Sequence, residues 1–203
     1  MAKIIRDDID KFFDYEIHVP SRTVYMGSVT HSISEGESGT DGAMAERVVK
    51  ALHLLDRASK EPITIIMNNI GGDEVHGMAI YDAIKACKSH VTVQVFGHAM
   101  SMGSIIMQAA DTRVMAPNAK MMIHYGTVSF SGHAKTVQKM DKEAEKYDKW
   151  MENMYLDKIH VKHPDFKLVK LKRMLDFDTF FWSQEAVDMG LCDMVLGEED
   201  GQV

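Results

Sequence analysis

Cysteine and proline are scarce in this chain, and long apolar runs are missing. The 203 residues include two cysteines, Cys87 and Cys192, and four prolines. Two cysteines give no disulfide framework, so we expect buried thiols and a reducing compartment. No stretch approaches the roughly 18 continuous apolar residues that a membrane span needs. The start of the chain, Met1 to Asp8, has no signal-peptide core. These absences predict a soluble, cytoplasmic protein with no membrane association.

The chain also lacks an excess of positive charge and lacks metal-binding motifs. Lys and Arg number 23 against 30 Asp and Glu, a formal net charge of −7, which argues against nucleic-acid binding. Among ten histidines, His160 and His163 are three apart, but no His-Glu-x-x-His or paired Cys-x-x-Cys motif occurs. No Gly-x-x-x-x-Gly-Lys-Ser/Thr phosphate loop occurs either. We therefore predict no metal, no cofactor and no ATP hydrolysis by this chain.

The residues that are present favour one α/β domain over residues 1–203. A hydrophobic content of 45% is enough to bury a core in a chain of this length. Ile63–Met67 and Val91–Phe96 are β-branched and apolar, and each leads through a glycine turn into a helical pattern. Two such units in succession predict a parallel sheet, whose sites form beyond the carboxyl ends of the strands.

One serine lies in the second of these turns. Gly97-His98-Ala99-Met100-Ser101-Met102-Gly103 follows a predicted strand and precedes the apolar run that begins at Ile105. A serine at a strand-to-helix turn exposes its Oγ, and the helix N-terminus behind it offers N–H groups to an oxyanion. Serine is also a preferred helix N-cap. The pattern alone leaves both a nucleophile and a cap open.

The first turn contains a glycine pair, Gly71 and Gly72, within Asn68-Asn69-Ile70-Gly71-Gly72-Asp73. Glycines let backbone N–H groups approach a ligand without an intervening Cβ. We expect this pair to lie beside Ser101, because parallel strands end at the same edge of a sheet. A loop that only reverses the chain is the alternative.

Several motifs, in order from about Tyr15 to Val195, resemble the ClpP family, the proteolytic subunits of the Clp protease. They are Asn69-Ile70-Gly71-Gly72, Gly77 to Asp82, Ala99 to Gly103, Pro117-Asn118, Met122-Ile123-His124 and Glu185 to Asp193. The resemblance includes divergent and phage-type members of the family. It implies a spiral of ββα units with a protruding long handle helix at about 134–160. It also implies an axial segment at residues 1–14.

Catalytic roles follow from that resemblance. Ser101 corresponds to the nucleophile and His124 to the general base, with the backbone N–H groups of Gly72 and Met102 as the oxyanion hole. Histidine suits this role chemically, because a serine hydroxyl needs a base poised to accept its proton. A lone histidine at a strand end can also be structural.

The resemblance also implies a third member of the triad, an aspartate upstream of Glu185. The chain offers Asp176 and Asp178. Asp176 fits the shorter spacing found in phage-type relatives, so we predict Asp176, with Asp178 in reserve. Its role is to accept the second imidazole N–H and hold the tautomer. Either carboxylate could instead be a solvated charge at a helix start.

Substrate binding is expected along Gly71, Tyr125, Gly126 and Gly132, where the family adds the substrate to the site as a strand. The chain departs from the family pattern here. Ile70 stands where a proline is usual, and Tyr125-Gly126 stand where Gln-Pro is usual. These changes bear on substrate preference more than on the triad.

A long helix from Ala134 to Lys158 is predicted from apolar residues at spacings of three and four: Val137, Met140, Ala144, Tyr147, Met151 and Met154. A seam this narrow indicates packing against a long element, on another chain or on its own domain. The resemblance favours a homo-oligomer of two stacked rings, usually heptameric. On this interpretation Met151→Asp disrupts assembly.

Three functions remain open on the sequence. The first is a serine endopeptidase that degrades unfolded polypeptide inside a barrel, with ATP hydrolysis supplied by an AAA+ unfoldase partner. The second is a catalytically silent ring subunit. The third is a crotonase-type acyl-CoA enzyme, since that superfamily shares the spiral fold and glycine oxyanion hole.

Overall fold

A computed structural model describes residues 6–27, 39–127 and 129–197, and this part contains eight strands and seven helices. The helices are α1 (Arg6–Tyr15), α2 (Gly42–Ala58), α3 (Glu74–Ala86), α4 (Met102–Met107), α5 (Ala134–His160), α6 (Leu168–Leu175) and α7 (Ser183–Met189). The strands are β1 (Ile17–His18), β2 (Thr23–Met26), β3 (Ile63–Asn69), β4 (Val91–Met100), β5 (Thr112–Met115), β6 (Lys120–Ile123), β7 (Thr179–Trp182) and β8 (Met194–Val195).

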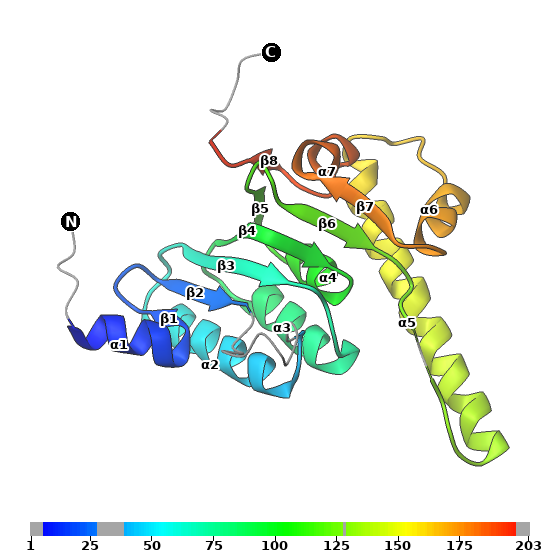
Figure 1. Ribbon diagram of the computed structural model, residues 1–203, viewed down its shortest axis with the longest axis horizontal. Helices are drawn as coiled ribbons and strands as arrows, with labels where there is room; N and C mark the ends of the chain where they lie inside the picture. The colour runs from blue at the N-terminus through cyan, green and yellow to red at the C-terminus, as the bar shows by residue number, and fades with distance from the viewer. Residues whose placement is uncertain (1–5, 28–38, 128, 198–203) are drawn as a thin grey trace.

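The strands form one mostly parallel sheet. Its main path is β1-β2-β3-β4-β5-β8, and β6 and β7 branch from β4. The long strand β4 pairs with β5 along its first half and with β6 along its last three residues, both in parallel. β7 then pairs antiparallel with β6. The branch therefore brings the ends of β4 and β6 and the start of β7 to one place (Figure 1).

The predicted strand–turn–helix units are both present. The apolar run at Ile63 forms β3 and leads to α3, whose N-cap Asp73 accepts a hydrogen bond from the His76 N–H. The run at Val91 forms β4, which continues through Gly97 to Met100, beyond the predicted end at Phe96. α4 begins two residues later. The mixed α/β class expected from the sequence is confirmed.

Burial explains why these segments are strands. In β3 and the first half of β4, every second residue is buried, and the others are half-buried except Asn68, which is exposed. The buried residues join one continuous core with the apolar faces of α2, α3 and α4. Both faces of the central strands are thus largely covered, as expected for a parallel sheet.

The long helix α5 has 27 residues and two different halves. Its buried residues all lie between Met151 and Ile159, whereas the half that begins at Ala134 extends away from the body (Figure 1). Trp150 anchors the junction, with its ring edge-on to Tyr81 of α3 at a centroid distance of 5.2 Å. The predicted single seam is therefore divided between a projecting part and a part inside the domain.

This division corrects the prediction for Met151. The side chain is 1% exposed and belongs to the core of its own domain. A charge at this position would destabilise the fold itself, so Met151→Asp is no test of assembly. Met140, in the projecting half, is 41% exposed.

The N-terminal part of the described chain is helical, and neither cysteine forms a disulfide. Of the predicted axial segment at residues 1–14, residues 6–14 belong to α1, and residues 1–5 lie outside the described part. Both cysteines are free thiols: Cys192 is buried and Cys87 half-buried. Burial raises the pKa of Cys192 to about 11, so this thiol stays protonated near neutral pH. Within the described residues, no helix combines the length and the apolar character that crossing a membrane requires.

Candidate active site

Ser101 lies between the end of β4 and the start of α4. Its side chain makes no capping hydrogen bond to the helix, so the N-cap interpretation does not describe it. Instead, Ser101 Oγ lies 2.8 Å from His124 Nε2. The two residues meet because β4 and β6 are parallel neighbours with Met100 opposite Met122. Each chain therefore leaves the sheet at the same level, one towards Ser101 and the other towards His124.

The backbone of Ser101 has a positive φ of +49°, with ψ at −122°. A residue other than glycine in such a region carries strain of about 1–3 kcal/mol, which neighbouring contacts must hold in place. The Ser101 N–H donates to the Met122 carbonyl at 2.9 Å. The Ser101 carbonyl accepts from the Ser104 hydroxyl at 2.6 Å, and that hydroxyl is 2.6 Å from the Tyr155 hydroxyl of α5. Sequence patterns did not identify Tyr155, which is fully buried and so resembles any core aromatic.

The acid beside His124 is Asp178. Its Oδ1 lies 2.8 Å from His124 Nδ1. Strand register explains the contact: Ile123 of β6 is opposite Thr179 of antiparallel β7, so the next pair outward is His124 and Asp178. An ionised carboxylate only accepts hydrogen bonds, so the imidazole proton belongs on Nδ1. Nε2 is then free to accept from the serine hydroxyl.

This geometry favours Asp178 over the predicted Asp176. Asp176 is the C-cap of α6, where its N–H donates to the Lys172 carbonyl at 2.9 Å. The shorter spacing from the Glu185 motif favoured it, but pairing with β6 selects the residue that faces His124. Asp178 was the reserve candidate, and it is the one that the register brings to the imidazole.

The glycine pair lies against the serine, as expected. A Cβ on Gly71 would come within 2.6 Å of Ser101 Cβ and 3.1 Å of the Met102 nitrogen, so a side chain there would displace the site. Gly72 pairs in parallel with Thr40, which bonds to the Gly71 carbonyl and the Asp73 N–H. The Gly71 carbonyl, which faces Thr40, and the Gly72 N–H belong to one trans peptide group, so the Gly72 N–H points away from Thr40. The first N–H groups of α4, Met102 included, have no partner within the helix.

A cavity of about 400 Å³ opens beside Ser101. It is lined by Gly72, Asp73, Glu74, Ser101, Met102, Ile105, His124, Tyr125, Gly126, Thr127, Tyr147 and Met151. Of the predicted substrate-binding residues, Tyr125 and Gly126 line it. Gly71 lies behind the serine, and Gly132 has open space around it at a φ of +141°.

Tyr125 connects the segment after His124 to two helices. Its hydroxyl donates to Glu152 Oε1 of α5 at 2.6 Å, and Glu152 Oε2 is 3.1 Å from Lys172 Nζ of α6. Its N–H donates to the Leu175 carbonyl at 2.9 Å. Burial, followed by the bond to Glu152, raises the pKa of Tyr125 well above its ordinary value. Sequence reasoning predicted Tyr125 as a substrate-binding residue and did not identify Glu152 or Lys172.

A hydroxyl, an imidazole and a carboxylate in one hydrogen-bonded series, with free N–H groups at the same turn, is the arrangement found in serine hydrolases. No group of three or more potential metal ligands occurs among the residues that the structure describes. The side chains of Ser101, His124 and Asp178 form a hydrogen-bonded acid–base series of the hydrolase type.

Comparison with known proteins identifies the family. The family model described as Clp protease matches residues 29–199. A curated relative, the "ATP-dependent Clp protease proteolytic subunit" of Deinococcus radiodurans, is 35% identical over 161 residues, which cover 78% of this chain and 76% of the relative. This chain belongs to the Clp protease family and is a ClpP-type peptidase.

Proposed function

We propose that this protein is a serine endopeptidase in which Ser101 is the nucleophile, His124 the general base and Asp178 the residue that orients the base. The observation that carries the proposal is the position of His124, with Nε2 on Ser101 Oγ and Nδ1 on Asp178 Oδ1, each at 2.8 Å. Ser101 attacks the scissile carbonyl while His124 takes its proton. His124 then returns the proton to the leaving amine, and an acyl-enzyme remains on Ser101.

The backbone N–H groups of Gly72 and Met102 are proposed as the oxyanion hole. Both residues line the cavity beside Ser101, and the close packing of Gly71 against Ser101 supports this assignment. Donors fixed in advance around a developing oxyanion stabilise it without reorganisation during the reaction. Water activated by His124 then hydrolyses the acyl-enzyme and frees Ser101.

The wider setting is proposed by analogy with the family. The Deinococcus radiodurans relative is named as the proteolytic subunit of an ATP-dependent protease. We infer that this chain likewise forms stacked rings, that an AAA+ unfoldase supplies ATP hydrolysis, and that unfolded polypeptide is the substrate in the cytoplasm. The projecting half of α5 offers a surface for contacts between rings.

The test is a fluorophosphonate probe on the purified protein, read by intact mass. The wild type should gain a single adduct, and Ser101→Ala should gain none, because the variant removes one hydroxyl and leaves the fold intact. Labelling of the Ser101→Ala chain would contradict the proposed nucleophile.

A wild type that stays unlabelled in its assembled form, as measured by light scattering, would indicate a silent ring subunit instead. An unlabelled and unassembled sample would show that the site needs the ring. A crotonase-type activity has no specific support, since the site has a complete serine, histidine and aspartate series.

A further inference from the structure

The cavity beside Ser101 has walls of two kinds. Met102, Ile105, Tyr147 and Met151 form an apolar part, and Asp73 and Glu74 add two carboxylates. The Tyr147 hydroxyl lies 3.5 Å from Met102 Sδ, so the apolar part begins next to the nucleophile's helix. A substrate side chain that enters this cavity from Ser101 would thus have both apolar atoms and the two carboxylates within reach.

The two carboxylates differ in their availability. Asp73 is the N-cap of α3 and accepts from the His76 N–H at 2.9 Å. No hydrogen bond or ion pair engages the Glu74 carboxylate within the part of the chain that the structure describes. Its pKa is raised, first by partial burial and then by the negative charges of Asp148 and Asp73. Among the described residues, Glu74 is therefore a carboxylate in a locally negative environment that forms no ion pair.

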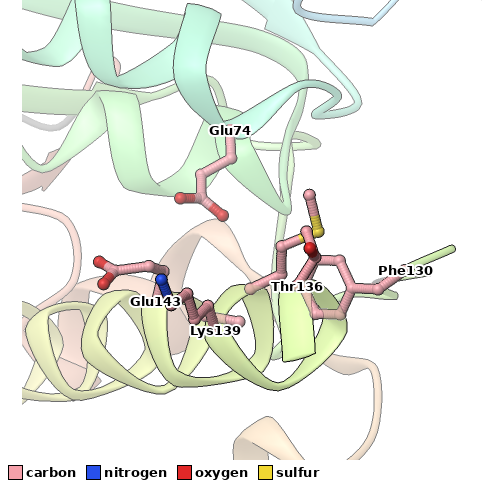
Figure 2. Close-up of a pocket in the computed structure, with 7 residues that line it drawn as sticks. Glu74, Phe130, Thr136, Lys139 and Glu143 are labelled. Atoms are coloured by element: carbon pink, nitrogen blue, oxygen red, sulfur yellow. The ribbon is translucent and has the colours of Figure 1, made fainter. Parts of the chain in front are cut away.

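The negative charge of Glu74 also acts on Tyr147, another residue that lines the cavity. The pKa of Tyr147 is raised by burial, and next by the charges of Glu74 and Asp148. Glu74 also borders a second cavity, of about 570 Å³, between α3 and the projecting half of α5. Figure 2 shows Glu74 reaching from α3 towards α5, where Lys139 and Glu143 lie. No ion pair joins Lys139 to Glu74 among the described residues.

We propose that Glu74 makes the cavity beside Ser101 a subsite for a basic side chain, so that the enzyme prefers lysine or arginine immediately before the scissile bond. This inference rests on the proposed function of Ser101. Lysine and arginine have an apolar stem and a cationic tip, which match a cavity with apolar walls and an acceptor carboxylate. A cation there would also relieve the repulsion among Glu74, Asp73 and Asp148.

The experiment uses two peptidyl diphenyl phosphonates that react with an activated serine and differ only at the residue before the phosphorus. One has a lysine-like side chain, and the other has norleucine, which keeps the stem and lacks the charge. Rates of adduct formation on the full chain are read by intact mass. Glu74→Gln is the test variant. Glu61→Gln is the matched control, because Glu61 is an exposed glutamate in the turn before β3 that lines neither cavity.

We expect the wild type and Glu61→Gln to react about two- to fivefold faster with the lysine-like reagent, the range of a partly solvated ion pair. The preference should fall as salt is raised. In Glu74→Gln the rates should become nearly equal, through loss of the lysine-like rate and not a gain in the norleucine rate.

Two other results are distinguishable. If the fluorophosphonate labels Ser101 but the two phosphonates react equally, or not at all, or keep their ratio in Glu74→Gln, the basic subsite is refuted while the nucleophile stands. If the fluorophosphonate also fails on the assembled protein, the proposed function fails, and this inference fails with it.

Discussion

At the scale of single residues, the site depends on a serine in an unfavourable backbone conformation and on an aspartate at the surface. The Asp178 side chain is 58% exposed, whereas that of His124 is 23% exposed. An exposed carboxylate contributes little to folding, so its contact with His124 is better explained by orientation of the imidazole than by stability.

Replacing each candidate acid by asparagine should show which of the two orients His124. We expect Asp178→Asn to lower kcat by about 10²- to 10⁴-fold, because an amide can hold the wrong imidazole tautomer. Asp176→Asn should lower it by less than about threefold, since Asp176 caps α6 and does not contact His124. Peptide hydrolysis by both variants checks this, with equal melting temperatures as the control. A larger loss in Asp176→Asn would reverse the assignment.

At the scale of elements, the pairing of strands decides what motif spacing could not. The contact between Ser101 and His124 was predictable, because each residue lies beyond an apolar strand pattern in a motif that resembles the family's. The carboxylate beside His124 was not, because the turn between α6 and β7 offers Asp176 and Asp178 two residues apart. Only the register of β7 on β6 shows that Asp178 is opposite His124. Likewise, the spacing of apolar residues predicted α5 but not which of its turns are buried in the domain.

The two halves of α5 should respond differently to charge. Met151→Asp places a carboxylate in the core, where an unpaired charge costs about 3–5 kcal/mol, so the melting temperature should fall steeply. Met140→Asp lies in the projecting half and should leave the melting temperature within a few degrees. Light scattering then tests whether that half joins subunits: a smaller particle from folded Met140→Asp supports the contact, and an unchanged particle contradicts it.

At the scale of the whole molecule, an ion pair connects the segment before β8 to the neighbouring strand β5. Arg113 of β5 pairs with Asp193, which immediately precedes β8. Asp193 Oδ2 accepts from the Arg113 backbone N–H at 2.7 Å, and Arg113 Nη1 donates to the Gln108 amide oxygen and the Gly190 carbonyl. Burial alone would raise the pKa of Asp193, but its bonds to Arg113 outweigh this and hold the pKa below its ordinary value.

This pair predicts a defined pH dependence of stability. Because the pKa of Asp193 is lower in the folded state, its contribution is complete above the ordinary carboxyl value of about 4 and is lost as the pH falls through the folded value. Asp193→Asn should cost about 1–3 kcal/mol at pH 7. The difference in melting temperature between the wild type and Asp193→Asn should become smaller below about pH 4. A gap that stays constant down to pH 2 would contradict the linkage.

The support of Ser101 by distant parts of the chain has a consequence for biosynthesis. The serine emerges from the ribosome well before His124, Tyr155 and Asp178, which respectively contact its hydroxyl, brace its backbone and orient its base. Chains fold largely from the N-terminus during synthesis. On the proposed mechanism, a nascent chain therefore carries an inert serine until β7 has joined the sheet, so proteolytic capacity arises only after β6 and β7 have been made and have paired.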